Sequence, residues 1–183
     1  LIFQPHTSAG RMPTIKGYKT YLDTFTETEE VEKKVIKYLD VVKQAYFQKK
    51  AQEKIYDSVS IISNAISNVS FATIPGDKRT FYLGISNILR QPEFLREPIQ
   101  ASQVIEILEE NDRFIKTLTD LGVDDNIKIF IGEDNLIPKI HSCSIIATNY
   151  TYEGYKGIIG ILGPTRMNYP FNIAILKEIK KMV

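Results

Sequence analysis

One stretch near the end of the chain combines residue types that could bind an anion: GIIGILGPTRMNYP, residues 157–170. Its apolar run stops at Gly163-Pro164, Arg166 follows, and a helical pattern begins a few residues later. Free N–H groups at the start of a helix attract anions, and an arginine adds a pair of parallel donors. Such a loop could hold a phosphorylated or acyl substrate and act on it.

The same stretch lacks the spacing of a phosphate-binding loop. No lysine followed by Ser or Thr comes after a glycine and a four-residue gap, and Pro164 and Pro170 each remove one backbone donor. The alternative is a strand-to-helix connection, in which Asn168 or Tyr169 caps the helix and Pro170 lies in its first turn. We favour this structural interpretation.

In that interpretation Arg166 pairs with an acid such as Glu133 or Asp134, or with backbone carbonyl groups. The two acids follow a strand pattern, where catalytic acids often lie. Adjacent carboxylates in a turn point in different directions, however, and do not form an acid–base pair. We therefore expect a solvated turn in which Asn135 satisfies backbone groups.

The other reactive side chains form no catalytic or metal-binding pattern. His6 and His141 lack a ligand-spaced partner, and Cys143, between Ser142 and Ser144 in a strand pattern, is interpreted as a small core residue. No serine has the flanking glycines of a nucleophile elbow. We predict no catalytic residue, no metal and no cofactor, and hence no enzyme.

The amino-acid composition is typical of a soluble globular protein. The 183 residues are 43% hydrophobic and 25% charged with a net charge of +1, so any DNA contact must come from a local patch. No apolar stretch approaches the roughly 20 residues of a membrane span. The single Cys143 excludes an internal disulfide and fits a cytoplasmic setting. The chain begins in the middle of an element, so we interpret it as a piece of a longer polypeptide.

The first 23 residues form the segment of the chain whose charges are most strongly of one sign, and that sign is positive. Arg11, Lys16 and Lys19 all precede the first acid, Asp23. The pattern predicts the end of a strand, a polar connection and a short helix that Thr14 can cap. This stretch suits contact with phosphate groups, although an ordinary exposed loop explains it equally well.

The periodicity of the remaining residues predicts an α+β domain with a mainly antiparallel sheet and helices covering one face. Helical patterns over residues 28–46 and on to residue 67 form one long helix or two. The later elements, in chain order, are a hairpin in 68–86, a proline-broken loop in 88–100, a helix in 102–121, strands in 126–132, 142–152 and 154–163, and a helix in 169–182.

Four segments, in the right order, resemble the HrcA family of heat-inducible transcription repressors. PHTSAGRMPTIKGYKTYLD (5–23) resembles the end of that family's winged-helix domain. Three further segments resemble the signatures of its C-terminal domain: GISNILRQPEF (84–94), IFIGEDN (129–135) and GIIGILGPTRMNYP (157–170).

The resemblance implies three parts: the wing and exit helix of a winged-helix domain (1–24), a helical connector (25–68) and a GAF-like regulatory domain (69–183). It also implies a cytoplasmic repressor of chaperone genes that binds an inverted-repeat operator as a homodimer, with the chaperonin GroEL as a partner. The recognition helix would lie before Leu1, so this chain would be mainly the regulatory and dimerisation part and would bind operator weakly or not at all.

The resemblance also assigns residues. Contact with the DNA backbone would involve His6, Ser8 and Arg11, with Lys16 next, whereas the signature loop would be architectural, with members Gly163, Pro164, Arg166 and Asn168. Asn168 stands where the family usually has an acid, and this favours a capping role because Asn and Asp are equivalent caps.

One departure concerns dimerisation. Only GDK (76–78) separates the hairpin strands, which leaves no room for the family's inserted dimerisation segment. An apolar helical stripe is a candidate replacement surface, although a core-facing role is favoured; its members are Ile55, Val59, Ile62 and Ile66.

Two other functions are compatible with this sequence. A GAF-like sheet without a DNA-binding role could be a small-molecule sensor, by analogy of fold alone. An enzyme could act on a phosphorylated or acyl substrate at residues 163–166.

Overall fold

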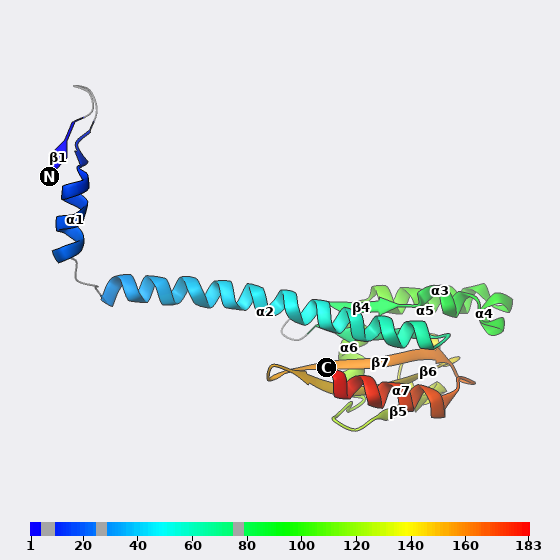
Figure 1. Ribbon diagram of the computed structural model, residues 1–183. Helices are drawn as coiled ribbons and strands as arrows, with labels where there is room; N and C mark the ends of the chain where they lie inside the picture. Colours follow the sequence, from blue (N-terminus) through cyan, green and yellow to red (C-terminus); the bar gives the residue numbers. More distant parts are fainter. Residues whose placement is uncertain (5–9, 25–28, 75–78) are drawn as a thin grey trace. The chain divides into compact units, whose positions relative to one another are not determined.

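The computed structural model of the chain (Figure 1) describes residues 1–4, 10–24, 29–74 and 79–183. The chain divides into two compact units, residues 1–45 and residues 46–183. The boundary falls inside the helix α2 (Glu29–Ala65), which is one continuous helix of 37 residues. The open question of one long helix or two is thereby answered.

The first unit contains a small ribbon and a helix. Strand β1 (Ile2–Phe3) pairs antiparallel with β2 (Met12–Pro13), and α1 (Ile15–Thr24) follows. The backbone N–H of Gly17 donates to Thr14 Oγ1 at 3.1 Å. Thr14 therefore caps α1, as predicted, by satisfying one of the donors that a helix start leaves open.

The second unit is built on a five-stranded sheet with the order β4-β3-β7-β6-β5, in which every adjacent pair is antiparallel. The strands are β3 (Val69–Thr73), β4 (Thr80–Leu83), β5 (Lys128–Ile131), β6 (Cys143–Tyr152) and β7 (Tyr155–Pro164). Glu153 and Gly154, with φ of 49° and 84°, form the predicted tight turn between β6 and β7.

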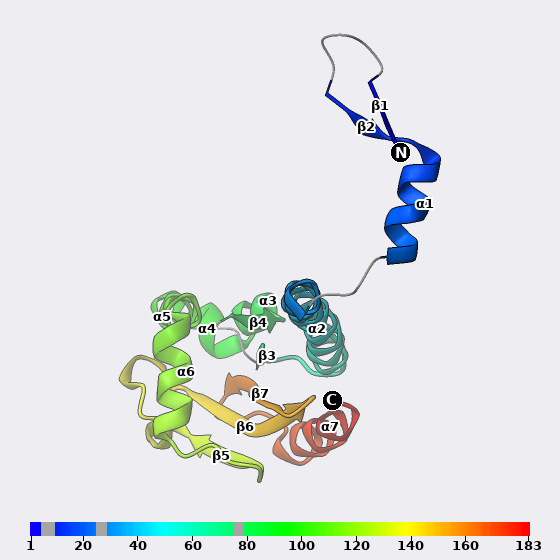
Figure 2. The ribbon, with the colours of Figure 1, turned by 90° about the vertical axis from the view of Figure 1, so that its left-hand side faces the viewer.

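Helices cover both faces of this sheet, not one as predicted (Figure 2). One face carries α7 (Tyr169–Met182) and the last part of α2. The other carries α3 (Ile85–Leu89), α4 (Pro92–Arg96), α5 (Pro98–Glu109) and α6 (Asn111–Asp120). Both faces need cover because β6 buries successive residues, Ile145 on one side and Ile146 on the other.

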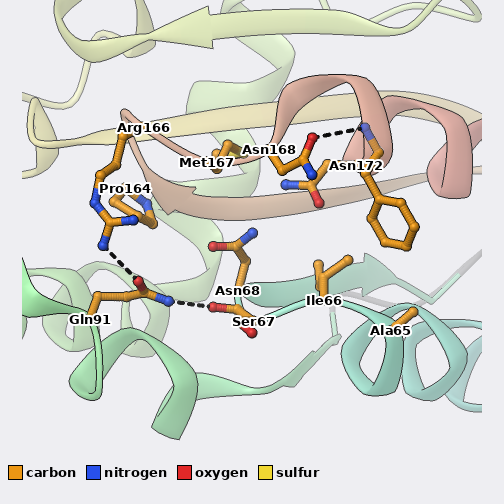
Figure 3. A pocket seen from close by; sticks show the side chains of 11 residues that line it. Ala65, Ile66, Ser67, Asn68, Gln91, Pro164, Arg166, Met167, Asn168 and Asn172 are labelled. Carbon is orange, nitrogen blue, oxygen red and sulfur yellow. Dashed lines mark hydrogen bonds between the residues drawn. The ribbon is translucent and has the colours of Figure 1, made fainter.

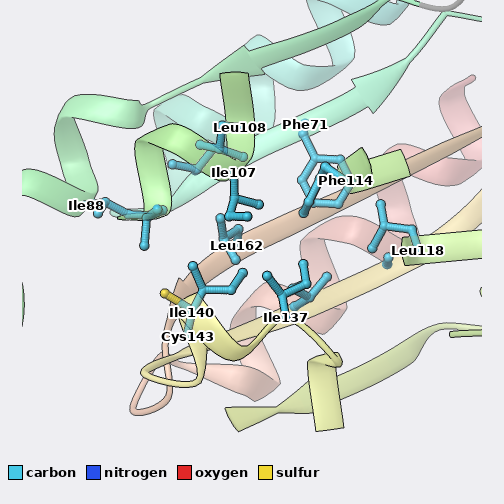
Figure 4. Packing of buried hydrophobic residues seen from close by; sticks show 14 of the residues in the cluster. Phe71, Ile88, Ile107, Leu108, Phe114, Leu118, Ile137, Ile140, Cys143 and Leu162 are labelled. Carbon is cyan, nitrogen blue, oxygen red and sulfur yellow. The ribbon is translucent and has the colours of Figure 1, made fainter. Parts of the chain in front are cut away.

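The face under α3–α6 holds the larger aromatic cluster (Figure 4). Phe71 of β3 meets Phe114 of α6 edge to face, with ring centroids 5.1 Å apart. Gly160 of β7 makes room for this cluster, because a Cβ there would lie 2.6 Å from Phe71 Cζ. On the opposite face, Gly157 makes similar room for the ring of Tyr150.

The apolar stripe of α2 lies in the core of the second unit. It packs with Ile146, Ile161 and Leu176 of the sheet and α7. The proposal of a dimerisation surface for the stripe is corrected, because side chains buried in this way are not available to a second copy. The core-facing alternative describes all four members: Ile55, Val59, Ile62 and Ile66.

Two further predictions fail at prolines and at a helix break. Pro92 and Pro98 do not interrupt a loop; each lies in the first turn of a helix, where a missing N–H costs nothing. The helix expected over 102–121 is interrupted at Glu110, whose ψ of 55° is not helical. Gly122 has the left-handed φ of 71° expected of a residue after a helix end.

Leu118 in α6 is fully buried, and its replacement should be costly. We expect Leu118→Ala to lower the free energy of unfolding by about 2–5 kcal/mol, because a cavity is left beside Phe114. Leu95→Ala is the matched control, since this leucine is 66% exposed and should change stability by less than about 0.5 kcal/mol. Urea denaturation of both variants measures the difference; equal effects would contradict the assigned core.

Candidate functional site

The signature loop connects the end of β7 to the start of α7. Asn168 is the residue before the helix, and its Oδ1 accepts a hydrogen bond from the Phe171 N–H at 3.3 Å. Pro170 lies in the first turn. The loop is therefore a capped strand-to-helix connection, and the prediction that Asn168 or Tyr169 caps it is confirmed for Asn168.

The helix start offers few backbone donors to an anion. The N–H groups of Tyr169 and Asn172 donate to backbone oxygens at 2.9 and 3.0 Å, that of Phe171 is held by Asn168, and Pro170 has none. A helix terminus binds phosphate through unsatisfied N–H groups. At the start of α7 these groups are already occupied within the chain.

Arg166 pairs with Glu93 of α4 instead of the predicted Glu133 or Asp134. Its Nε donates to Glu93 Oε1, and its Nη2 donates to Glu93 Oε2 at 2.9 Å. This bidentate geometry fits the planar guanidinium to the carboxylate. The hydrogen bond from Arg166 is the main cause that lowers the pKa of Glu93 below its ordinary value of 4.5.

The arginine also ties the loop to the segment after α2. Arg166 Nη2 donates to Gln91 Oε1 at 3.1 Å, and Gln91 Nε2 donates to the backbone oxygen of Ser67 at 2.7 Å. Three segments far apart in sequence are thus linked through one guanidinium: the signature loop, the start of α4 and the turn after α2. Arg166 is held by a carboxylate and by an amide oxygen, so we interpret the contact as structural.

Because Gly163 has no side chain, the side chain of Asn68 can lie close to β7. A Cβ at Gly163 would lie 2.7 Å from Asn68 Cγ, nearer than non-bonded carbon atoms approach. Asn68 follows α2 directly and is largely buried. Glycine is needed here to make room for an asparagine amide.

These segments line an open pocket of about 470 Å³ (Figure 3). Its wall is made of amides, one arginine and several apolar side chains. The lining residues come from the end of α2 and the turn that follows (Ala65, Ile66, Ser67, Asn68), from Gln91, and from the signature loop and α7 (Pro164, Arg166, Met167, Asn168, Phe171, Asn172).

Asn172 is the unusual member of this lining. Its side chain is 1% exposed, and its Nδ2 is buried without a hydrogen-bond partner among the described residues. Sequence reasoning missed Asn68, Gln91, Glu93 and Asn172 as site residues. A signal was present for Asn172, because it stands four residues after Asn168, on the same side of the helix.

The other candidate groups do not contribute chemistry to this pocket. Cys143 is fully buried, and burial raises the pKa of its thiol to about 12, so it is an inert core residue as predicted. Asn135 satisfies backbone groups, as expected: its Nδ2 donates to the oxygens of Ile140 and Cys143, and its Oδ1 accepts from the Ile137 N–H. Within the described ranges, no three His, Cys, Asp or Glu residues come together as a metal site.

The predicted DNA-contact residues belong to the first unit. Arg11 and Lys16 are exposed, on either side of the short strand β2. His6 and Ser8 lie outside the described residues. In the part of the chain that the structure describes, no helix is long and apolar enough to span a bilayer.

The architecture defines an α+β domain with an antiparallel sheet flanked by helices. A crystal structure of a hypothetical protein shares this fold, with a TM-score of 0.62 over 99% of this chain and 79% of that chain, at 12% identity. Residues 23–173 match the family described as HrcA protein C terminal domain, so the chain belongs to the HrcA family. The expected GAF-like, α+β character of the domain is confirmed.

Relatives in several bacteria carry the name heat-inducible transcription repressor HrcA. The protein from Brevibacillus brevis is 36% identical over 104 residues, which are 56% of this chain and 30% of the relative. The protein from Lachnoclostridium phytofermentans is 22% identical over 281 residues, which cover 97% of this chain and 80% of the relative. The chain spans 30% of the length of the relatives from Brevibacillus brevis and Halalkalibacterium halodurans and 39% of that from Carboxydothermus hydrogenoformans.

The capping role of Asn168 can be tested by two substitutions. Asn168→Ala should lower the free energy of unfolding by about 0.5–2 kcal/mol, because the Phe171 N–H loses its partner. Asn168→Asp should keep nearly all of the stability, since a carboxylate caps equally well. Thermal and urea denaturation measure both. A loss in Asn168→Asp as large as in Asn168→Ala would contradict a capping role.

The Arg166–Glu93 pair predicts an acid-dependent stability. The pKa of Glu93 is lowered in the folded chain, so the pair stabilises the fold fully above the ordinary value and loses its contribution as pH falls through the lowered one. The side chains are 55% and 34% exposed, so water and salt screen the pair and its contribution to stability should be small.

Denaturation of the wild type and of Arg166→Ala between neutral and acid pH measures this contribution. Their difference in stability should shrink on acidification, and Glu93→Gln should remove the pH-dependent part. A difference that stays constant with pH would contradict the assigned pair.

Proposed function

We propose that this chain is the regulatory part of a transcription repressor of heat-shock genes. Its support is the match of residues 23–173 to the HrcA C-terminal domain. The name of the relatives in Brevibacillus brevis and Lachnoclostridium phytofermentans points to the same role. A repressor works on DNA in the cytoplasm of a bacterium, which is the location proposed for this chain.

In this proposal residues 1–24 are the wing and exit helix of a DNA-binding domain. The two-stranded ribbon β1–β2 followed by α1 is compatible with such a wing. Arg11 and Lys16 are exposed near the ribbon, where cations can contact phosphates without reading bases. His6 and Ser8, which lie outside the described residues, complete the proposed contact set.

Residues 25–68 act as the helical connector and residues 69–183 as the GAF-like regulatory domain. The complete protein would bind an inverted-repeat operator as a homodimer, and the chaperonin GroEL would be its regulatory partner. The alignment with the relative from Lachnoclostridium phytofermentans supports a compact form of the family. It is 281 residues long, whereas this chain has 183 residues. Within the aligned region, the relative therefore contains residues that have no counterpart in this chain.

The other two functions have less support. A sensor module without a DNA-binding role does not agree with relatives that are named transcription repressors. An enzyme at the signature loop would need a free cation, whereas Arg166 is paired with Glu93 and bonded to Gln91. We therefore propose a binding protein and not a catalyst.

Salt dependence tests the DNA contact in the complete gene product that contains this chain. Each phosphate contact contributes about 0.9 to the slope of log affinity against log salt concentration. Arg11→Ala and Lys16→Ala should each reduce that slope by about this amount, without changing the preferred sequence. Fluorescence anisotropy with an inverted-repeat duplex at several salt concentrations measures both.

Lys139→Ala provides the control, since this lysine pairs with Glu106 in the second unit. Its slope should equal that of the wild type. If the complete protein has no affinity for an inverted repeat, the repressor proposal is wrong; if affinity is normal but the Arg11 and Lys16 variants leave the slope unchanged, only the wing contact is wrong.

A further inference from the structure

We propose that the pocket beside the signature loop binds a neutral amide group. The pocket is the 470 Å³ space described above between β7, α7 and the turn after α2. Its volume falls within the range of about 300–1,000 Å³ that is typical of small-ligand sites. The amide would be a free carboxamide or the peptide group of an extended polypeptide.

The main observation is the unpaired amide of Asn172. An Nδ2 group buried without a partner costs free energy, because it has lost its water and gained nothing in return. Figure 3 shows this amide pointing into the pocket from the first turns of α7. A residue of this kind is explained if a second molecule supplies the missing hydrogen bond.

A second amide reaches the same space. Asn68 lies across the pocket from α7, and Figure 3 shows its amide directed toward the loop. Its backbone oxygen accepts from Asn87 Nδ2 at 3.4 Å, but its side chain makes no hydrogen bond with any residue the structure describes. Gly163 is what allows this amide to stand so close to β7.

The charge of the lining argues for a neutral ligand. Arg166 is the one charged residue among the described residues that line the pocket, and Glu93 neutralises it through two hydrogen bonds. The backbone donors of the α7 start are occupied as well. A phosphate or carboxylate would thus meet no free positive charge.

The remaining preference is for a group that both donates and accepts. A side-chain amide has two donors and one acceptor, so another amide can satisfy both of its ends. Ile66 and Met167 add apolar surface to the lining, and Phe171 stands half-exposed within it. A short alkyl group attached to the ligand amide would contact these side chains.

The side-chain NH₂ signals of Asn172 and Asn68 in nitrogen–proton correlation spectra test the proposal. The 183-residue chain would be titrated with acetamide and with N-acetylalanine methylamide, each to tens of millimolar. Both neutral amides should shift these two signals saturably. Tighter binding of the second compound would identify a peptide group as the natural source, and equal binding a free carboxamide.

N-acetylalanine, which carries a carboxylate, and inorganic phosphate are the charged comparison compounds. Neither should shift the two signals at the same concentration. If the neutral amides leave both signals unchanged, or if phosphate shifts them as strongly, the proposal is overturned.

Two variants separate a ligand site from a structural role. Asn172→Leu removes the unpaired amide and should abolish binding while raising the denaturation midpoint, because an apolar group suits a buried place without partners. A lowered midpoint would show that the amide is satisfied within the folded chain, and would count against the proposal. Asn64→Leu, at an exposed position of α2, is the matched control and should bind as the wild type does.

Asn68→Ala provides a second readout if the leucine variant does not fold. It only removes atoms, and the loss of one neutral hydrogen bond should weaken amide binding about 3- to 10-fold. Unchanged binding in Asn68→Ala would contradict the proposed site. Amide binding is measured here without DNA, so its failure is distinguishable from a failure of the repressor proposal.

Discussion

The burial of β6 and β7 on both faces is the constraint on which the second unit depends. These two strands pair over ten residues, from Cys143 opposite Pro164 to Tyr152 opposite Tyr155. Alternate side chains point to opposite faces, so each face must be covered by helices. The chain supplies the end of α2 and α7 for one face and the α3–α6 group for the other.

This constraint also creates the pocket. When β7 ends, the chain must turn back onto the sheet to place α7, and the signature loop makes that turn. The same face receives α2, whose end meets the loop across Asn68. Arg166 holds the junction from the α4 side through Glu93 and Gln91. The loop thus connects β7 to α7, and in the space beside it the Nδ2 of Asn172 has no hydrogen-bond partner among the described residues.

Local patterns in the sequence predicted most of the elements. The 169–182 helix, the turn at Glu153 and the cap at Thr14 each follow from nearby residues, so they were found without knowledge of the fold. The partner of Arg166 was not predictable in this way. Glu93 is 73 positions away, and only the packing of α4 against the loop region brings the two together.

The same limit explains the other errors. The period of the α2 stripe predicts one apolar face, but period alone does not say whether that face meets the sheet or a second copy. Pro92 and Pro98 were assigned to a loop because proline interrupts a helix, although it is also favoured in a first turn. The unpaired Asn172 amide is a property of three-dimensional packing. The spacing from Asn168 indicates only that the two residues share a side of the helix.

β7 carries a glycine at every third position from Gly157 to Gly163. Glycine gives up more backbone freedom than any other residue when it becomes extended, and it brings no side chain to pack. β7 consequently has little tendency to become a strand by itself. Its extended form is stabilised by side chains of other strands that pack against its glycines, such as the rings of Phe71 and Tyr150. The central strand of this sheet therefore depends on both of its neighbours, β3 and β6, for the side chains that keep it extended.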